Sequence, residues 1–173
     1  CPCDDRNVLF HVCRNEEDEL ARRLFAGAVK PNDLVSLFGP FGDFVLKKDS
    51  PNDLVFVACD SGFAPVKSLI EHAVASDLPG MQRLIWAATR PDGHYYENQC
   101  RAWADALETF SYVALRAADL QTAGIEAARR VLDEDELGHR DVYIVGPVAF
   151  VSAVEHALSA GGLPASQMIS EVL

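Results

Sequence analysis

The sequence predicts an α/β protein whose larger part is a parallel sheet of about five strands. Two observations lead to this prediction. Short apolar runs, typical of strands that are buried on both faces, recur after residue 53. Between these runs lie segments whose apolar residues follow helical spacing. Such alternation of strand and helix requires parallel strands, with helices on both faces of the sheet.

The elements of this larger part follow from the same two patterns. Strands are predicted at residues 54–58 (LVFVA), 84–88 (LIWAA), 112–115, 142–145 (VYIV) and 168–169. Helices are marked by apolar residues from Val66 to Val74, Cys100 to Phe110, Ile125 to Leu132 and Val151 to Leu158. Ligands of such sheets bind at the carboxyl ends of the strands, so the loops that follow the strands are the expected functional region.

The first part of the chain lacks this alternation of strand and helix. Residues 7–13 (NVLFHVC) and 34–38 are predicted as strands, and residues 16–28 as a helix with acidic residues in its first turn. The stretch from Ser50 to Asp53 contains a proline and turn-forming residues. We therefore expect a domain boundary there, with residues 1–50 and 51–173 in separate domains.

Composition excludes several classes of function. The formal net charge is -11, from 26 acidic and 15 basic residues, whereas a nucleic-acid-binding surface needs basic residues. No apolar run approaches the ~20 residues of a membrane span, and no basic-then-apolar leader opens the printed sequence. Its start at Cys1, without Met, is typical of a processed or shortened end. The five cysteines are odd in number and lack zinc-site spacing, so we expect reduced thiols, no metal and a cytoplasmic protein.

The loop after the first buried strand is the first candidate site. It reads Cys59-Asp60-Ser61-Gly62-Phe63-Ala64-Pro65 and leads into a helix. Proline is tolerated in the first turn of a helix, glycine permits close approach of a ligand, and the free N–H groups attract an anion. An ordinary strand–helix turn capped by Asp60 or Ser61 explains the same residues equally well.

A second candidate lies at the end of the strand at residues 142–145. Gly146 and Pro147 follow this strand and open the next helix. A Gly-Pro pair at this place lets a flat ring lie against the backbone. The same pair also starts helices that bind nothing, so by itself it is a weak signal.

Taken in order, these motifs resemble those of the ferredoxin–NADP reductase superfamily. The matching segments are GPFGDF (39–44), FVACDSGFAP (56–65), VYIVGP (142–147) and Glu171. The sequence looks closest to bacterial reductases that pair a flavin module with a plant-type [2Fe-2S] domain. The resemblance implies a Rossmann-like NAD(P)-binding domain, preceded by the C-terminal remnant of an antiparallel FAD-binding β-barrel. It also implies NAD(P)H and FAD as cofactors and an iron–sulfur centre as electron acceptor.

The resemblance also assigns residues to the cofactor site, but no catalytic acid or base. The residues it implies are Asp60, Ser61, Gly62, Phe63, Ala64, Pro65, Arg90, Arg116, Gly146, Pro147 and Glu171. Arg90 and Arg116 end the second and third strands of the larger part and are candidates for a ribose phosphate. A surface role explains these two arginines equally well.

The sequence departs from the family pattern at several places. It has no Arg-x-Tyr-Ser flavin segment, Cys59 and Asp60 replace glycines of the family's Gly-Gly-Thr-Gly turn, and Val145 replaces a cysteine. These departures leave open a nucleotide-binding or interaction module without hydride-transfer activity. They also predict that the Asp60 carboxylate caps the helix and repels a pyrophosphate, so that Asp60→Gly would tighten NAD(P)H binding. A hydrolase with Cys59 or Ser61 as nucleophile is disfavoured, because the G-x-S-x-G turn is absent.

Overall fold

A computed structural model describes residues 7–39, 41–47, 49–133 and 139–173. Cys1, Cys3 and Pro40, which the sequence analysis considered, lie outside the described residues. The chain divides into two compact units: residues 9–43 form one, and residues 1–8 and 44–173 form the other.

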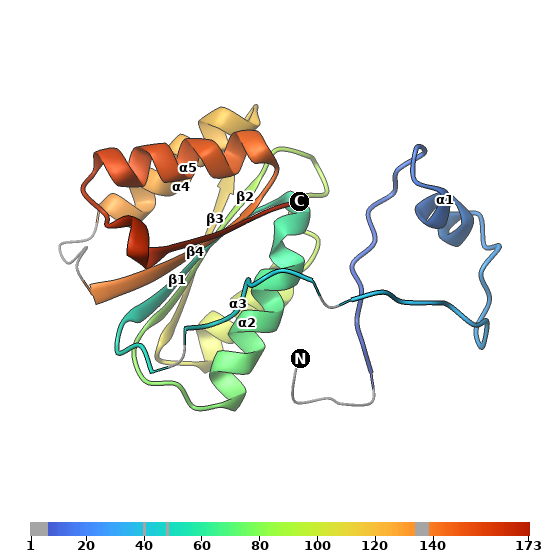
Figure 1. The fold of residues 1–173 in the computed structure, drawn as a ribbon, viewed down its shortest axis with the longest axis horizontal. Coiled ribbons are helices and arrows are strands. Elements are labelled where there is room, and N and C mark those ends of the chain that lie inside the picture. Colours follow the sequence, from blue (N-terminus) through green and yellow to red (C-terminus); the bar gives the residue numbers. More distant parts are fainter. Residues whose placement is uncertain (1–6, 40, 48, 134–138) are drawn as a thin grey trace. The chain divides into compact units, whose positions relative to one another are not determined.

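The larger unit is a five-stranded parallel sheet with helices on both faces, as predicted (Figure 1). The strands are β1 (Asp53–Cys59), β2 (Gln82–Ala88), β3 (Phe110–Arg116), β4 (Arg140–Gly146) and β5 (Met168–Val172). The helices are α2 (Phe63–Ala75), α3 (Glu97–Ala106), α4 (Leu120–Leu132) and α5 (Val148–Ala160). Short 3-10 helices span Asp60–Gly62 and Ala165–Gln167.

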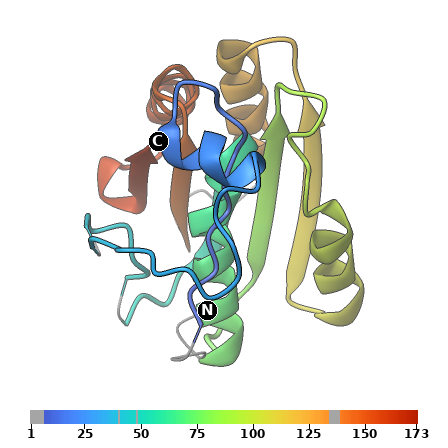
Figure 2. The same ribbon diagram turned by 90° about the vertical axis from the view of Figure 1, so that its right-hand side faces the viewer.

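The strand order is β3-β2-β1-β4-β5, so the chain leaves the centre of the sheet in both directions. One apolar core lies between the sheet and helices α4 and α5, and a second lies between the sheet and helices α2 and α3 (Figure 2). Apolar side chains of β1 and β4 point alternately into the two cores, which explains why these strands appear in the sequence as continuous apolar runs.

One helix boundary differs from the prediction. The apolar positions from Cys100 to Phe110 suggested a single helical face, but α3 ends at Ala106 and Phe110 opens β3. Phe110 and Trp103 are in edge-to-face contact with ring centroids 5.8 Å apart. Phe110 therefore reaches the same apolar core from the strand, which explains why its spacing resembled helical periodicity.

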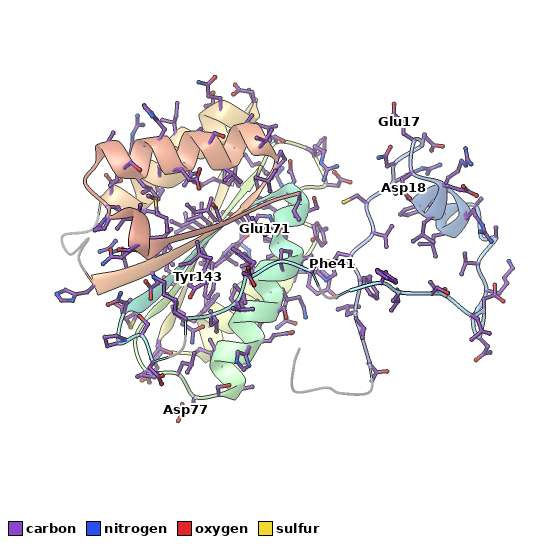
Figure 3. All side chains as sticks on the ribbon, viewed as in Figure 1. Glu17, Asp18, Phe41, Asp77, Tyr143 and Glu171 are labelled. Atoms are coloured by element: carbon purple, nitrogen blue, oxygen red, sulfur yellow. The ribbon has the colours of Figure 1, made fainter. Side chains whose placement is uncertain are left out.

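The segment before β1 is fixed to the larger unit by a buried carboxylate. Asp141 of β4 is fully buried and accepts hydrogen bonds from Lys47 Nζ (2.6 Å) and Ser50 Oγ (2.5 Å). The Lys47 backbone N–H donates to Tyr143 Oη at 2.9 Å, and the Phe44 ring packs edge-on against Tyr143, which Figure 3 labels on β4. Phe44, Lys47 and Ser50 thus attach the segment before β1 to the sheet.

The smaller unit does not show the antiparallel strands expected of a barrel remnant. Its described residues form one helix, α1 (Glu19–Phe25), and no strand. The helix is shorter than the expected 16–28 because Asp18 caps it, accepting a hydrogen bond from the Ala21 N–H at 2.7 Å. The predicted strands at residues 7–13 and 34–38 do not form. A strand needs a partner that accepts and donates its backbone hydrogen bonds, and these segments pair with none in the described part of the chain.

Candidate functional site

The loops that follow β1, β2 and β4 meet at the carboxyl edge of the sheet. The central strand β1 pairs with both β2 and β4, with Cys59 opposite Ala87 and Ala58 opposite Val145. The ends of these three strands are therefore at the same level. This juxtaposition brings most of the residues that the sequence analysis singled out to one edge.

The turn after β1 leaves a helix N-terminus that no side chain caps. The short helix Asp60–Gly62 leads directly into α2, and in this described segment neither helix start receives a side-chain hydrogen bond. Pro65 lies in the first turn of α2, as expected. Backbone N–H groups at the N-terminus of a helix favour anions because they are unsatisfied and carry the positive end of the helix dipole.

The orientation of Asp60 corrects the expectation that it caps this helix. Asp60 is buried, and its carboxylate points toward the loop after β2. Oδ1 accepts a hydrogen bond from the Thr89 N–H at 3.0 Å, and Oδ2 accepts one from the Thr89 hydroxyl at 2.7 Å. The carboxylate therefore does not occupy the N–H groups at the start of α2.

Gly62 is required by packing against the protein's own backbone. A Cβ built at this position would lie 2.5 Å from the carbonyl oxygen of Val145, which is too close for any side chain. The sequence alone suggested that this glycine permits close approach of a ligand. The structure shows that the turn after β1 lies against the end of β4, which brings Ser61 and Gly62 beside Gly146.

Phe63 has its side chain in the core. It is fully buried and stacks on Trp86 with ring centroids 4.1 Å apart. Its backbone N–H donates to the carbonyl oxygens of Asp60 and Ser61 within the turn. Ala64 and Pro65 are half-buried at the start of α2.

The end of β4 carries Gly146 and Pro147 as predicted. Pro147 is the N-cap of α5, and its carbonyl accepts hydrogen bonds from the N–H groups of Phe150 and Val151. The Gly146 carbonyl accepts a hydrogen bond from the Leu173 N–H at 3.1 Å. The Gly-Pro pair thus begins a helix, which was the simpler of the two readings, and also lies beside the turn after β1.

Glu171 lies on β5 beside Val145, its partner in the parallel register (Figure 3). Paired residues of neighbouring strands point to the same face of a sheet. Val145 belongs to the core that contains Phe63, so Glu171 is on the face of the sheet that α2 covers. Its side chain is half-buried. The structure therefore brings Glu171 to the same face and edge as the turn after β1.

The two candidate arginines lie on the other side of that turn. Arg90 follows β2, and its Nε lies 3.8 Å from Asp60 Oδ2 with 46% of its side chain exposed. Arg116 is exposed at the end of β3, opposite Ala88. The cofactor candidates therefore form two groups. One contains Ser61, Gly62, Gly146, Pro147 and Glu171, and the other contains Asp60, Arg90 and Arg116.

A hollow of about 490 Å³ lies next to the second group, at the start of α3. The residues that line it are His94, Tyr95, Tyr96, Glu97, Asn98 and Gln99. His94 is buried, and its Nε2 lies 2.8 Å from the Trp86 carbonyl oxygen, whereas 40% of Tyr95 is exposed. Tyr95 thus presents an aromatic surface at the edge of the sheet that carries the arginines.

Thr89 is the functional candidate that the sequence analysis missed. It connects the loop after β2 to Asp60 through both its N–H and its hydroxyl. A polar residue directly after a buried strand was the available signal. Its partner lies 29 residues away, beyond the reach of local patterns.

The buried thiol at the end of β1 argues against a cysteine nucleophile. Burial raises the pKa of Cys59 to about 12, and the neighbouring Asp60 charge adds to this effect. Because the thiolate is the nucleophile, a thiol with such a pKa is unreactive near neutral pH.

Two further findings concern the described residues as a whole. None of their helices combines the length and apolar character that a membrane crossing requires. Among the same residues, no cluster of His, Cys, Asp or Glu is arranged to hold a metal ion.

Comparison with known proteins places the chain in a family. Residues 56–156 match the model of the oxidoreductase NAD-binding domain. The reductase component 2 of terephthalate 1,2-dioxygenase from Comamonas sp is 29% identical over 150 residues, which are 83% of this chain and 44% of that protein. The CDP-6-deoxy-L-threo-D-glycero-4-hexulose-3-dehydrase reductase of Yersinia pestis is 26% identical over 98% of this chain and 52% of its own length. The chain thus spans about half the length of these relatives.

Solved structures show the same fold. The ferredoxin-NADP+ reductase of Plasmodium falciparum superposes with a TM-score of 0.73 at 18% identity, over 88% of this chain and 65% of that one. The FAD/NAD-binding domain of a nitric oxide dioxygenase from Vibrio cholerae gives a TM-score of 0.59 at 18% identity, over 79% of this chain and 56% of that one. The chain belongs to the oxidoreductase NAD-binding domain family, and it shares its fold with ferredoxin-NADP+ reductase.

Proposed function

We propose that this chain is the NAD(P)H-binding part of a flavin-dependent oxidoreductase, which passes electrons from NAD(P)H through FAD to an iron–sulfur centre or another acceptor. The observation that supports it best is the uncapped N-terminus of α2 beside Gly146, from which the Asp60 carboxylate is turned away. Relatives that are reductase components of oxygenase and dehydrase systems support the same proposal.

In this proposal the two groups of site residues bind two halves of NAD(P)H. The backbone N–H groups of Ser61, Gly62 and Ala64 take the pyrophosphate, since a helix N-terminus favours a phosphate. Gly146 and Pro147 provide a flat backbone surface for the nicotinamide, with Glu171 nearby. On the other side of the turn after β1, Arg90 and Arg116 take the adenosine half.

The task of this chain in hydride transfer is then binding, orientation and exclusion of water. A hydride carries its own electron pair from the nicotinamide to an acceptor ring, so the step needs no protein acid or base. This agrees with a site whose Cys59 thiol stays protonated. Gly146 and Pro147, held beside the turn after β1, fix the face on which the nicotinamide lies.

The described residues do not supply a flavin site of the family type. The chain has no Arg-x-Tyr-Ser segment, and its smaller unit forms no strand in the described range. We propose that residues 1–50 are the C-terminal part of a flavin-binding domain and residues 51–173 the NAD(P)H domain. Leu34 and Phe38 are almost fully exposed, at 104% and 94%, which supports a further protein surface that covers them. A cytoplasmic location remains a prediction that rests on the cysteines alone.

Calorimetric titration of this chain with NADH and with NADPH tests the nucleotide site. We expect binding of at least one of them, weakened at least about fivefold by Arg90→Ala, since charge-assisted hydrogen bonds contribute roughly 1.5–3 kcal/mol. Arg129→Ala is the matched control, because Arg129 is an exposed arginine of α4 that pairs with Glu126. Absence of binding at millimolar concentrations of both nucleotides would contradict the proposal.

A nucleotide-binding or interaction module without hydride transfer is the second candidate function. Asp60 and Val145, which stand where the family has glycine and cysteine, favour it. Colour separates the two functions: the full-length protein purifies yellow if it retains flavin. A colourless protein that still binds NAD(P)H would support the second function.

A further inference from the structure

Asp60 has a backbone conformation that is uncommon for a residue with a side chain. Its φ is +48°, in the left-handed region that glycine and, less often, asparagine and aspartate adopt. It is also buried, although carboxylates are seldom buried without partners. A strained, buried carboxylate at the edge of a nucleotide site indicates that surrounding contacts hold it there.

Apart from the neighbouring Cys59 thiol and Phe63 N–H, those contacts come from β2 and the loop that follows it. The Asp60 carbonyl oxygen accepts a hydrogen bond from Trp86 Nε1 at 3.0 Å. The carboxylate accepts one from the Thr89 N–H at 3.0 Å and one from the Thr89 hydroxyl at 2.7 Å. Asp60 thus connects the turn after β1 to the loop after β2 through both backbone and side chain.

The loop after β2 is shaped to close around this carboxylate. A Cβ built on Gly93 would lie 2.5 Å from Asp60 Oδ1 and 2.6 Å from the Ala88 Cβ. The loop therefore needs glycine at this position to pack against Asp60. Within the same loop, Arg90 Nε lies 3.8 Å from Asp60 Oδ2, so the carboxylate also attracts this guanidinium.

We propose that Asp60 is a positioning residue: it fixes the loop 89–93 and thereby places Arg90 for the adenosine half of a nicotinamide nucleotide. The inference rests on the proposed function. Because the Asp60 carboxylate is hydrogen-bonded to the N–H and hydroxyl of Thr89, Asp60 acts through the loop and not by touching the nucleotide. This reverses the sequence-based expectation for Asp60→Gly, since removal of the side chain releases the loop.

The test compares two variants of this chain. Asp60→Gly tolerates the positive φ but removes the carboxylate. Asp60→Asn also tolerates it, and its amide can accept from the Thr89 N–H and donate to the Thr89 hydroxyl. Calorimetric titrations use NADH, NADPH, AMP and nicotinamide mononucleotide. We expect Asp60→Gly to weaken binding of AMP and of the dinucleotides about tenfold, with Asp60→Asn within about threefold of wild type. Nicotinamide mononucleotide affinity should change in neither variant.

Two further variants separate positioning from general loss of structure. In an Arg90→Ala background, Asp60→Gly should add little to the loss of AMP affinity, because both changes remove the same placed guanidinium. Gly93→Ala keeps the carboxylate but pushes the loop away, so it should cause the same selective loss of AMP affinity. It remains informative if Asp60→Gly fails to fold.

The outcomes distinguish this inference from the proposed function. Unchanged or tighter AMP binding by Asp60→Gly would overturn the inference, as would an equal loss of AMP and nicotinamide mononucleotide affinity. Wild-type protein that binds none of these nucleotides would instead overturn the proposed function. If Asp60→Gly selectively loses affinity for AMP and Asp60→Asn retains it, both the inference and the proposed function are supported.

Discussion

Gly62 packs directly against the backbone of Val145, and a Cβ at Gly62 would lie 2.5 Å from the Val145 carbonyl oxygen. Two loops that are more than eighty residues apart in the sequence are thus in contact at the candidate nucleotide site. The neighbouring atoms are backbone atoms of β4, which is hydrogen-bonded on both sides within the sheet. This contact cannot relax by a change of side-chain rotamer.

Gly62→Ala should therefore destabilise the protein by about 1–3 kcal/mol, the usual cost of an inserted methyl group in a packed region. Urea denaturation followed by circular dichroism measures the change. Ser61→Ala, one residue earlier and half-buried, serves as control and should stay within about 0.5 kcal/mol of wild type. Equal stability of Gly62→Ala and wild type would show that the two loops separate more easily than the structure indicates.

Loss of the Lys47 ammonium should destabilise the sheet unit, because it leaves the buried Asp141 carboxylate without its counter-ion. Since 35% of the Lys47 side chain is exposed, we expect Lys47→Met to cost about 1–3 kcal/mol, less than a fully buried pair would. Arg101→Met removes an exposed helical ion pair with Glu97 and should leave the stability close to that of wild type. Similar losses from both variants would contradict a special role of the buried pair.

Stability should fall as the pH rises above 9. Burial raises the pKa of the Cys59 and Cys100 thiols from 9.0 to about 12, so between these values the unfolded chain releases protons that the folded chain retains. Proton release from the unfolded state favours unfolding, and stability is therefore lost through this window. Denaturant midpoints from pH 8 to 11 measure the slope. The Cys59→Ala/Cys100→Ala variant should show a shallower decline, and an equal slope would contradict the assignment.

FAD should bind to this chain alone weakly or not at all. The segments 7–13 and 34–38 form no strand, so they present no paired barrel wall to a flavin. Quenching of flavin fluorescence on titration with the protein measures the affinity. Sub-micromolar binding of FAD by this chain would overturn this expectation, and riboflavin is the control for non-specific stacking on exposed aromatic residues.

The sheet could be predicted from the sequence because its central strands are apolar on both faces. The runs at 54–58, 84–88 and 142–145 each lie within an observed strand. The helix starts after Gly62 and Pro147 were also accessible, because glycine and proline act locally. Residues 7–13 and 34–38 have strand-like composition but do not pair, since pairing depends on partners that local composition does not reveal.

The candidate site was less predictable because its key contacts are long-range. The position of the loops followed from the sheet topology, but the direction of the Asp60 carboxylate depends on Thr89, which lies beyond the next helix and strand. Capping by a neighbouring aspartate was the locally sensible expectation. Gly62 was recognised as necessary, while the reason for it lies in the packing of β4.

The anchoring of Lys47 and Ser50 on Asp141 constrains how this domain can be exchanged between proteins. A recombination point at Pro51 would look natural in the sequence, yet it would leave the buried Asp141 with a foreign partner segment. Gene fusions that preserve the ion pair must be joined before Phe44, whose ring packs on Tyr143. The segment that can be exchanged intact therefore begins at Phe44 and not at the turn before β1.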